Sequence, residues 1–515
     1  MQTDRLARAA RAEPTAGQQS MRRVASGTIV NLAGALVAGV AGLGLTVVVT
    51  RGLSQTDAGV FFSATSVFIL VSMLSQLGTG TGLVYFVSRC RALQTNQLIP
   101  YYLRAALRPV LVVSILCSVA IFAAASPLAE LTTPSHAGTT ASYLRVFAVF
   151  VPFAAMENVW LSATRGLATM VPYSVVEQVA RPILQLALVA GVIFAGASTA
   201  SWAWAVSYAP AAVFAWFWWE RMVRLRAPTV GPTTPGLTKA FWKFTMPRSA
   251  TSVIQILMQR FDIVLVGALS GAVNAAIYAA ATRFVVAGQI GTTAIGRAAQ
   301  PQLGHSLARG DRVVTNHIYQ TSTAWLMLVT WPMFLIFIGF QDTLLRVFGK
   351  GYSAGSVVMI LISLSMLVAT GFGMVDMVLA MAGRTSWNLM NALVALTVNV
   401  GLDVWLVPVH GVLGAAIGWA AAILTQNMLA LTQVGTVMRL HPFGRITASA
   451  GVLSVLCYLV VPALTRLQFG QTVKGLLVAG VLGSAIYAVG LWRLRSTLEL
   501  ASLRIRRPRP GGGAS

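Results

Sequence analysis

The chain has 515 residues, of which 56% are hydrophobic and only 10% are charged. Soluble globular domains carry about 25% charged residues, so this composition excludes an ordinary soluble protein and indicates a polytopic membrane protein. The formal net charge of +24 at pH 7 raises the alternative of a nucleic-acid partner, which the placement of the basic residues can test.

Apolar segments of about 20 residues, the length that spans about 30 Å of hydrocarbon, recur along the whole chain. We predict an all-α polytopic membrane protein with about 14 transmembrane helices. An even number of spans places both termini on the same side of the membrane. In chain order the expected spans lie near residues 24–50, 58–88, 103–124, 141–163, 172–195, 201–222, 244–268, 272–298, 316–339, 352–382, 385–408, 411–438, 444–468 and 472–492.

The 37 Lys and Arg residues lie mostly in alternate loops. If the N-terminus is cytoplasmic, the loops that carry most of them are cytoplasmic too, as the positive-inside rule requires. This pattern accounts for the net charge and places both termini in the cytoplasm, so nucleic acid is not expected as a partner. Residues 1–23 and 496–515 are interpreted as basic cytoplasmic tails, and the second tail is able to touch anionic lipid headgroups. The three cysteines indicate no disulfide framework and no metal site, and no cofactor is expected.

A linker divides the chain into two similar parts. The segment from Arg226 to Gly236 is rich in Pro, Gly and Thr, and Leu237–Pro247 after it mixes aromatic residues with lysines, which predicts a short interfacial helix. The segments Gly52–Phe61 and Ala268–Tyr278 resemble each other, and each leaves one span and enters the next. Because they are six spans apart, we expect two six-helix lobes related by a pseudo-two-fold axis, plus two C-terminal helices. The expected parts are a basic tail (1–23), an N-lobe (24–222), a linker with the interfacial helix (223–243), a C-lobe (244–440), the last two spans (441–495) and a second basic tail (496–515).

Eight ionisable residues sit within apolar stretches of the chain, and a charge costs roughly 2.5–3.5 kcal/mol at a helix centre in a membrane. Such residues face a bundle interior or a water-filled cavity, so they indicate what the protein handles. The arginines fall toward the middle of their spans and most of the acids nearer the ends, which predicts a cavity with a cationic centre and an anionic cargo. The eight residues are Glu157, Glu177, Arg181, Arg260, Asp262, Arg283, Asp376 and Asp403.

Short motifs in both lobes carry a family resemblance. They are Asn31, Thr50–Phe62, Leu77–Gly78 and Gly82–Phe86 in the first lobe, and Phe244–Pro247, Gln259–Gly267, Ala276–Tyr278 and the loop from Pro301 to Asp311 in the second. Over roughly residues 24–440 the chain resembles polysaccharide-lipid flippases of the Wzx type, which belong to the multidrug/oligosaccharidyl-lipid/polysaccharide exporter superfamily.

The resemblance implies a V-shaped pair of lobes around a central cavity that opens alternately to each side of a bacterial cell (inner) membrane. The implied cargo is an oligosaccharide linked to undecaprenyl pyrophosphate, flipped from the cytoplasmic to the outer leaflet for cell-surface or exopolysaccharide biosynthesis. A polysaccharide polymerase or glycosyltransferases are the implied protein partners. The implied protein is a transporter and not an enzyme.

Arginine suits a pyrophosphate because its planar fork binds phosphate oxygens in pairs and keeps its charge. Gln255 and Gln259 share a helical face near Arg260, which favours a cavity lining. The expected substrate-binding residues are therefore Arg181, Arg260, Arg283, Gln255, Gln259 and Asn31.

Each arginine also has a structural interpretation. Arg181 follows Glu177 by one helical turn, so the two residues can form a neutralising ion pair. Arg260 and Asp262 can serve as packing contacts between lobes, and Asp262 is a candidate partner for Arg283. The acids are interpreted as gates or helix caps, or as a site for the proton or sodium ion that drives the return step. The residues with this ion-coupling or gating role are Glu177, Asp262, Asp376, Glu157 and Asp403.

Other functions stay open at this point. A lipid II flippase of the MurJ type also fits about 14 spans with a cationic cavity, and a cation-coupled multidrug antiporter of the same superfamily is a further alternative. The intramembrane arginines argue against a carrier of cationic drugs. An enzyme such as a polymerase or ligase needs a large outward loop with catalytic groups, and the outward loops near 125–140 and 340–351 are short.

Overall fold

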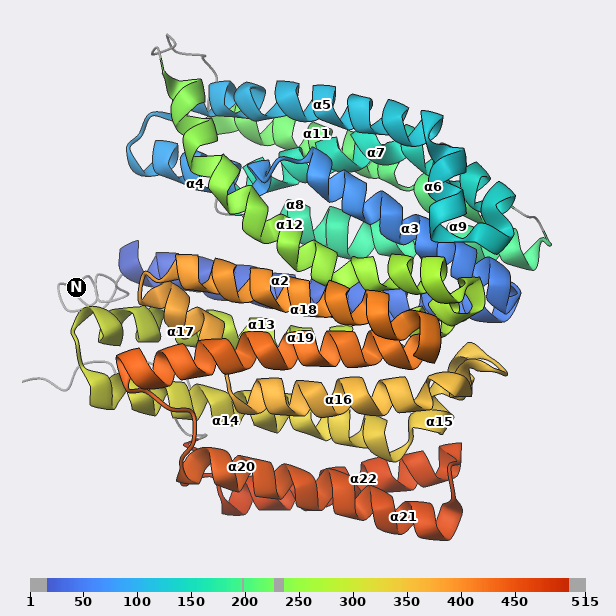
Figure 1. Ribbon diagram of the computed structural model, residues 1–515. Helices are drawn as coiled ribbons and strands as arrows, with labels where there is room; N and C mark the ends of the chain where they lie inside the picture. Colours follow the sequence, from blue (N-terminus) through green and yellow to red (C-terminus); the bar gives the residue numbers. More distant parts are fainter. Residues whose placement is uncertain (1–15, 168, 197–198, 227–235, 500–515) are drawn as a thin grey trace, which may run out of the picture. The chain divides into compact units, whose positions relative to one another are not determined.

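The computed structural model describes residues 16–167, 169–196, 199–226 and 236–499. The outer parts of both expected tails and most of the expected linker therefore lie outside the described residues. Within the described part the secondary structure consists of helices, without strands, which confirms the all-α prediction (Figure 1).

The first six expected spans all form helices. Their bounds are α2 (Ala16–Gly52), α3 (Gln55–Ser75), α4 (Thr79–Ala92), α5 (Ile99–Ala123), α6 (Ala125–Thr132), α7 (Ala137–Gly166), α8 (Val171–Tyr173), the π-helix η3 (Ser174–Ala180), α9 (Arg181–Phe194), α10 (Ala200–Ala205) and α11 (Tyr208–Arg226).

The remaining eight expected spans are helical too. Their bounds are α12 (Leu237–Ser270), α13 (Ala272–Ala308), α14 (Arg312–Gly339), α15 (Gln341–Leu345), α16 (Ser356–Gly371), α17 (Val375–Met381), α18 (Thr385–His410), α19 (Val412–Gln433), α20 (Arg445–Val455), α21 (Val461–Phe469) and α22 (Val473–Arg493).

Within the described part, 12 helical segments are long and apolar enough to cross a membrane. The two further spans expected near 201–222 and 272–298 correspond to α11 and α13, which are also helices. The prediction of about 14 transmembrane helices is therefore confirmed, and the protein is a multi-pass membrane protein.

Two of the spans are broken in the middle. The second expected span divides into α3 and α4, and the tenth divides into α16 and α17. In the second break Gly373 has φ +75°, and a Cβ there would lie 3.0 Å from the Cβ of Thr323 on α14. Tyr319 of α14 donates a 2.6 Å hydrogen bond to the carbonyl of Phe372, which satisfies a backbone group that the break sets free.

The interfacial helix expected at 237–247 is not separate, because α12 continues without interruption from Leu237 to Ser270. The aromatic residues there have a packing role. Phe241 is fully buried against α4 and α5, and Phe244 stacks on Tyr85 with ring centroids 4.1 Å apart. Burial of these rings anchors the first turns of α12 in unit 1.

The described chain divides into two compact units. Unit 1 comprises residues 1–45, 71–122 and 146–250, and unit 2 comprises residues 46–70, 123–145 and 251–515. The boundaries fall inside helices, so these units differ from the two lobes that the repeat predicts. The lobes themselves remain a prediction.

The core of unit 2 is formed by α13, α14 and α16–α19, among which α18 and α19 form the most extensive pairing (Figure 1). The C-terminal helices α20–α22 pack on α14. Leu453 and Tyr458 are buried in the same apolar cluster as Met327 and Tyr487, whose hydroxyl donates to the Leu328 carbonyl at 2.8 Å. The last two expected spans are therefore an integral part of unit 2.

Candidate functional site

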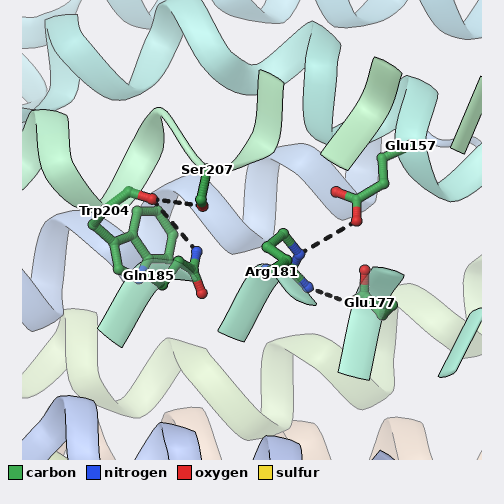
Figure 2. Close-up of polar contacts among 6 residues, drawn as sticks. All are labelled: Glu157, Glu177, Arg181, Gln185, Trp204 and Ser207. Carbon is green, nitrogen blue, oxygen red and sulfur yellow. Dashed lines mark hydrogen bonds and ion pairs between the residues drawn. The ribbon is translucent and has the colours of Figure 1, made fainter. Parts of the chain in front are cut away.

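In unit 1 three ionisable side chains meet, and we call them the charged triad: Glu157 of α7, Glu177 of η3 and Arg181 of α9 (Figure 2). Arg181 Nε lies 3.3 Å from Glu157 Oε1, and Arg181 Nη2 donates to Glu177 Oε1. The expected pair of Arg181 with Glu177 is confirmed. Glu157 is an additional partner, and its side chain is only 2% exposed, against 12% for Arg181 and 26% for Glu177.

The local fold of the charged triad follows from Pro182. Proline lacks a backbone N–H and its ring crowds the preceding turn, so an ordinary α-helix cannot run through it unchanged. The chain responds with the π-helix η3 directly before α9. Such π-helical insertions are frequent at functional sites. Glu177 and Gln178 both lie on η3, and Gln178 donates a 3.2 Å hydrogen bond to buried Asn31 of α2.

The aromatic ring of Tyr208 packs against the guanidinium of Arg181. The central carbon of the guanidinium lies 4.6 Å from the ring centroid of Tyr208, a cation–π contact. The bend between α10 and α11 brings Tyr208 there, and Gln185 and Ser207 both donate to the Trp204 carbonyl at this bend, at 3.5 and 2.9 Å (Figure 2). Arg181 is thus held by two carboxyl groups and an aromatic face.

In unit 2 two buried carboxyl groups, which we call the aspartate pair, come from different helices. Asp262 of α12 and Asp403 of α18 lie within hydrogen-bonding reach of each other. Tyr278 of α13 donates to Asp262 Oδ2 at 2.8 Å, and Asn399 donates to Asp403 Oδ2 at 3.4 Å. The Oδ1 atom of each aspartate is buried and accepts no hydrogen bond from a described residue. Two ionised carboxylates this close repel each other. The pair is stabilised when one carboxyl group takes a proton or when a cation binds between the two.

A glycine makes room at the aspartate pair. A Cβ at Gly418 of α19 would clash with the Oδ1 atom of Asp403. The absence of a side chain at Gly418 therefore gives the space that the carboxyl group of Asp403 fills.

The other two predicted arginines lie in the same unit. Arg283 of α13 stands over the ring of Phe62, with 5.7 Å between its central carbon and the ring centroid. Its buried Nε has no hydrogen-bond acceptor among the described residues. Arg260 of α12 is close enough to repel it electrostatically. Within the described part of the chain no carboxylate pairs with Arg283, so the alternative partner Asp262 does not neutralise it.

The predicted residues Gln255 and Gln259 are exposed on α12, and they precede Asp262 by two turns and one turn of the helix, respectively. Asp376 lies at the start of α17, where its Oδ2 accepts from Gln426 of α19 at 3.2 Å. Asn388 donates to the backbone carbonyl of Asp376 at 2.7 Å. The N-cap residue of α17 is Met374 and no side chain caps the helix, so Asp376 is not a helix cap. It lies in the first turn, where the helix dipole stabilises an acid.

The structure regroups the predicted residues. Asp403, expected as a gate near the outer end of its span, lies beside Asp262, and Asn31 is engaged by Gln178. Sequence reasoning missed Tyr278 and Tyr208 as partners of charged groups. The spacing of Asn399 and Asp403, one turn apart, is a signal that could have paired them. Among the described residues no group of three or more His, Cys, Asp or Glu side chains is placed to hold a metal ion.

Solved structures with similar folds include a lipid II flippase MurJ in an inward closed conformation (TM-score 0.72, 13% identity, 92% of this chain and 100% of that chain covered). An inward-facing multidrug resistance MATE family transporter of the MOP superfamily gives a TM-score of 0.64 at 14% identity, with 80% and 98% covered. A MOP superfamily transporter from Pyrococcus furiosus gives 0.54 at 14% identity, with 81% and 95% covered. At these identities the likeness establishes the fold.

The sequence itself matches two family models. One is described as "Polysaccharide biosynthesis protein" and covers residues 24–306, and the other, MatE, covers residues 247–405. A search of curated proteins found no match. Because the first model covers more than half of the sequence, the chain belongs to the polysaccharide biosynthesis protein family, a family of membrane flippases and transporters within the MOP exporter superfamily.

Proposed function

We propose that the protein flips an oligosaccharide linked to undecaprenyl pyrophosphate from the cytoplasmic to the outer leaflet of the bacterial cell membrane, by alternating access, in cell-surface or exopolysaccharide biosynthesis. The proposal includes cytoplasmic termini, contact with membrane lipids, and a polysaccharide polymerase or glycosyltransferases as partners. In this proposal the chain has no enzymatic activity of its own.

The observation that carries the proposal is Arg283. A charged side chain inside a membrane span costs roughly 2.5–3.5 kcal/mol at the helix centre, and a neighbouring positive charge raises that cost. Arg283 has such a neighbour in Arg260 and no carboxylate partner among the described residues. An anionic cargo removes both costs, since a pyrophosphate accepts paired hydrogen bonds from guanidinium groups.

The neighbouring polar side chains fit a sugar-bearing cargo. Gln255 and Gln259 are exposed on the same helix as Arg260, and their amides donate and accept hydrogen bonds, as sugar hydroxyls require. Asn31 and Arg181 were also predicted to bind substrate. Both are already bonded to protein partners. The buried Nε of Arg283 has no acceptor among the described residues, so we assign the pyrophosphate to Arg283 first, with Arg260 as its cationic neighbour.

The aspartate pair supplies a site for a coupling cation. Its two Oδ1 atoms are buried and lack donors among the described residues. A proton or a sodium ion bound by Asp262 and Asp403 would neutralise the like charges. Its release and rebinding can drive the return of the empty carrier.

The experiment is complementation of a strain that lacks its own polysaccharide-lipid flippase. Surface glycan and internally accumulated lipid-linked oligosaccharide are scored for the parent chain and for Arg260→Ala, Arg283→Ala and Arg283→Lys at equal membrane abundance. We expect rescue by the parent and loss with both alanine variants, with partial activity for lysine because it keeps the charge without the fork. Arg145→Ala is the matched control, since Arg145 is exposed and bonded to Ser126 in a different part of unit 2.

The same strains distinguish the rival cargoes. Flipping of lipid II or efflux of cationic drugs by the parent, without rescue of surface glycan in several glycan backgrounds, would transfer the assignment to those cargoes and leave the family unchanged. Equal rescue by the parent and Arg283→Ala would remove the anion-binding role from Arg283.

A further inference from the structure

The charged triad of unit 1 has an unbalanced charge. It holds two carboxyl groups and one guanidinium, so with every group ionised it carries a net charge of −1. Glu157 is 2% exposed, and its Oε1 accepts no hydrogen bond from a described residue even though Arg181 lies 3.3 Å away. A buried charge that is left over after pairing is strongly unfavourable.

Neighbouring helices bring no second cation to balance the triad within the described part of the chain. The groups that act on it are Tyr208 from α11, which faces Arg181, and Gln185 from α9, which bonds to Tyr208 and the Trp204 carbonyl. From α2 the nearest contribution is the amide of Asn31, bonded to Gln178. The two glutamates are close enough to each other that their charges interact directly.

We propose that Glu157 and Glu177 together bind one proton, with Arg181 balancing the carboxylate that remains. The proton resides on a Glu157 oxygen and forms an O–H···O hydrogen bond to Glu177, so the triad becomes neutral. It comes from water and returns to water, and no other reactant is needed. This site is distinct from the aspartate pair and does not depend on the identity of the cargo.

The geometry selects a proton over a metal ion. A sodium or calcium ion needs about six oxygen ligands, whereas the triad offers two carboxyl groups whose inner space is already occupied by the Arg181 guanidinium. That positive charge repels a metal ion. A proton needs only one lone pair, which the Oε1 atom of Glu157 has available.

The two glutamates have different tasks. The side chain of Glu177 is 26% exposed and lies on the π-helix, so solvent reaches it. Glu157 is nearly sealed from water and stores the proton.

The test compares infrared spectra of the purified full-length parent with those of its single variants, in lipid nanodiscs at neutral pH. The difference between each variant and the parent shows which carboxyl band is lost. The proposal places one protonated and one ionised carboxyl group in the triad. Glu157→Gln leaves Glu177 ionised beside Arg181, and Glu177→Gln leaves Glu157 ionised beside it. Each single variant is therefore expected to lose the carboxylic-acid C=O band of one group, while the carboxylate bands stay unchanged.

If both glutamates are ionised in the parent, each variant loses a carboxylate band, and the proposal is overturned. Should Glu157→Gln fail to fold, Glu177→Gln gives the same readout at a more exposed position. Glu130→Gln is the matched control, because Glu130 is exposed on α6 and is expected to lose only a carboxylate band. Sodium ions are expected to leave the triad band unchanged. Since no cargo is present, this result is independent of the flippase assignment.

Discussion

Replacement of Arg181 by methionine tests whether this arginine stabilises the fold of unit 1 or is available to bind the cargo. Removing one partner of a buried ion pair costs about 3–5 kcal/mol, because an uncompensated charge stays behind. In the charged triad Arg181 balances the one carboxylate that remains when Glu157 and Glu177 share a proton, and these two side chains are 2% and 26% exposed. That carboxylate is therefore largely buried, and the value for a buried pair applies to it. We therefore expect Arg181→Met to lower the free energy of unfolding by about 3–5 kcal/mol.

The size of this loss is measured by chemical denaturation of the purified protein in a mild detergent. A second substitution checks the cause. In Arg181→Met with Glu177→Gln the carboxylate that Arg181 balances is gone and Glu157 keeps the proton, so most of the lost stability is expected to return. Arg145→Met, at an exposed arginine, is the control and should change the unfolding free energy by no more than about 0.5 kcal/mol. If Arg181→Met unfolds within about 1 kcal/mol of the parent, the triad is not structural and Arg181 is available to bind the pyrophosphate.

Three further predictions concern unit 2 and the driving force. Tyr278→Phe removes the donor to buried Asp262 and should destabilise the protein by about 1–3 kcal/mol, measured by the same denaturation assay; an unchanged stability would show that Asp262 finds another donor. Gly418→Ala places a methyl group against Asp403 and should abolish the dependence of flux on the coupling cation while the protein stays folded; retained dependence would locate the cation elsewhere. Depolarisation should slow net outward flipping, because an inside-negative potential favours outward movement of each uncompensated negative charge by about 2.3 kcal/mol per 100 mV; equal flux before and after depolarisation would contradict this reasoning.

The spans were predictable because the hydrophobic requirement of the bilayer is local along the chain. Each of the expected spans is a helix, and the pair of Arg181 with Glu177 follows from a spacing of four residues. The breaks between α3 and α4 and between α16 and α17 were not predicted. At Gly373 the break depends on a contact with Thr323, more than forty residues earlier in the chain, which hydropathy does not register.

The charged residues of the candidate sites could be predicted from the sequence, but most of their partners could not. All eight intramembrane charges could be identified from the sequence, but their grouping depends on helix packing. Glu157 reaches Arg181 from another helix, and Asp403 reaches Asp262 across more than a hundred residues. The tyrosines that support these groups carry no charge and stood out in no hydropathy pattern. Arg283 was predicted as a cationic group in the membrane, and the structure adds the repulsion from Arg260.

The central claim is that the protein carries a pyrophosphate-linked glycan on its intramembrane arginines. The most direct measurement is flipping of a fluorescent undecaprenyl-pyrophosphate oligosaccharide in proteoliposomes that contain the parent or Arg283→Ala. The account predicts flipping by the parent, competition by inorganic pyrophosphate, and a loss of at least about tenfold in the variant, which corresponds to about 1.4 kcal/mol. Flipping by the variant at the parental rate, or no flipping by a well-folded parent, would contradict it.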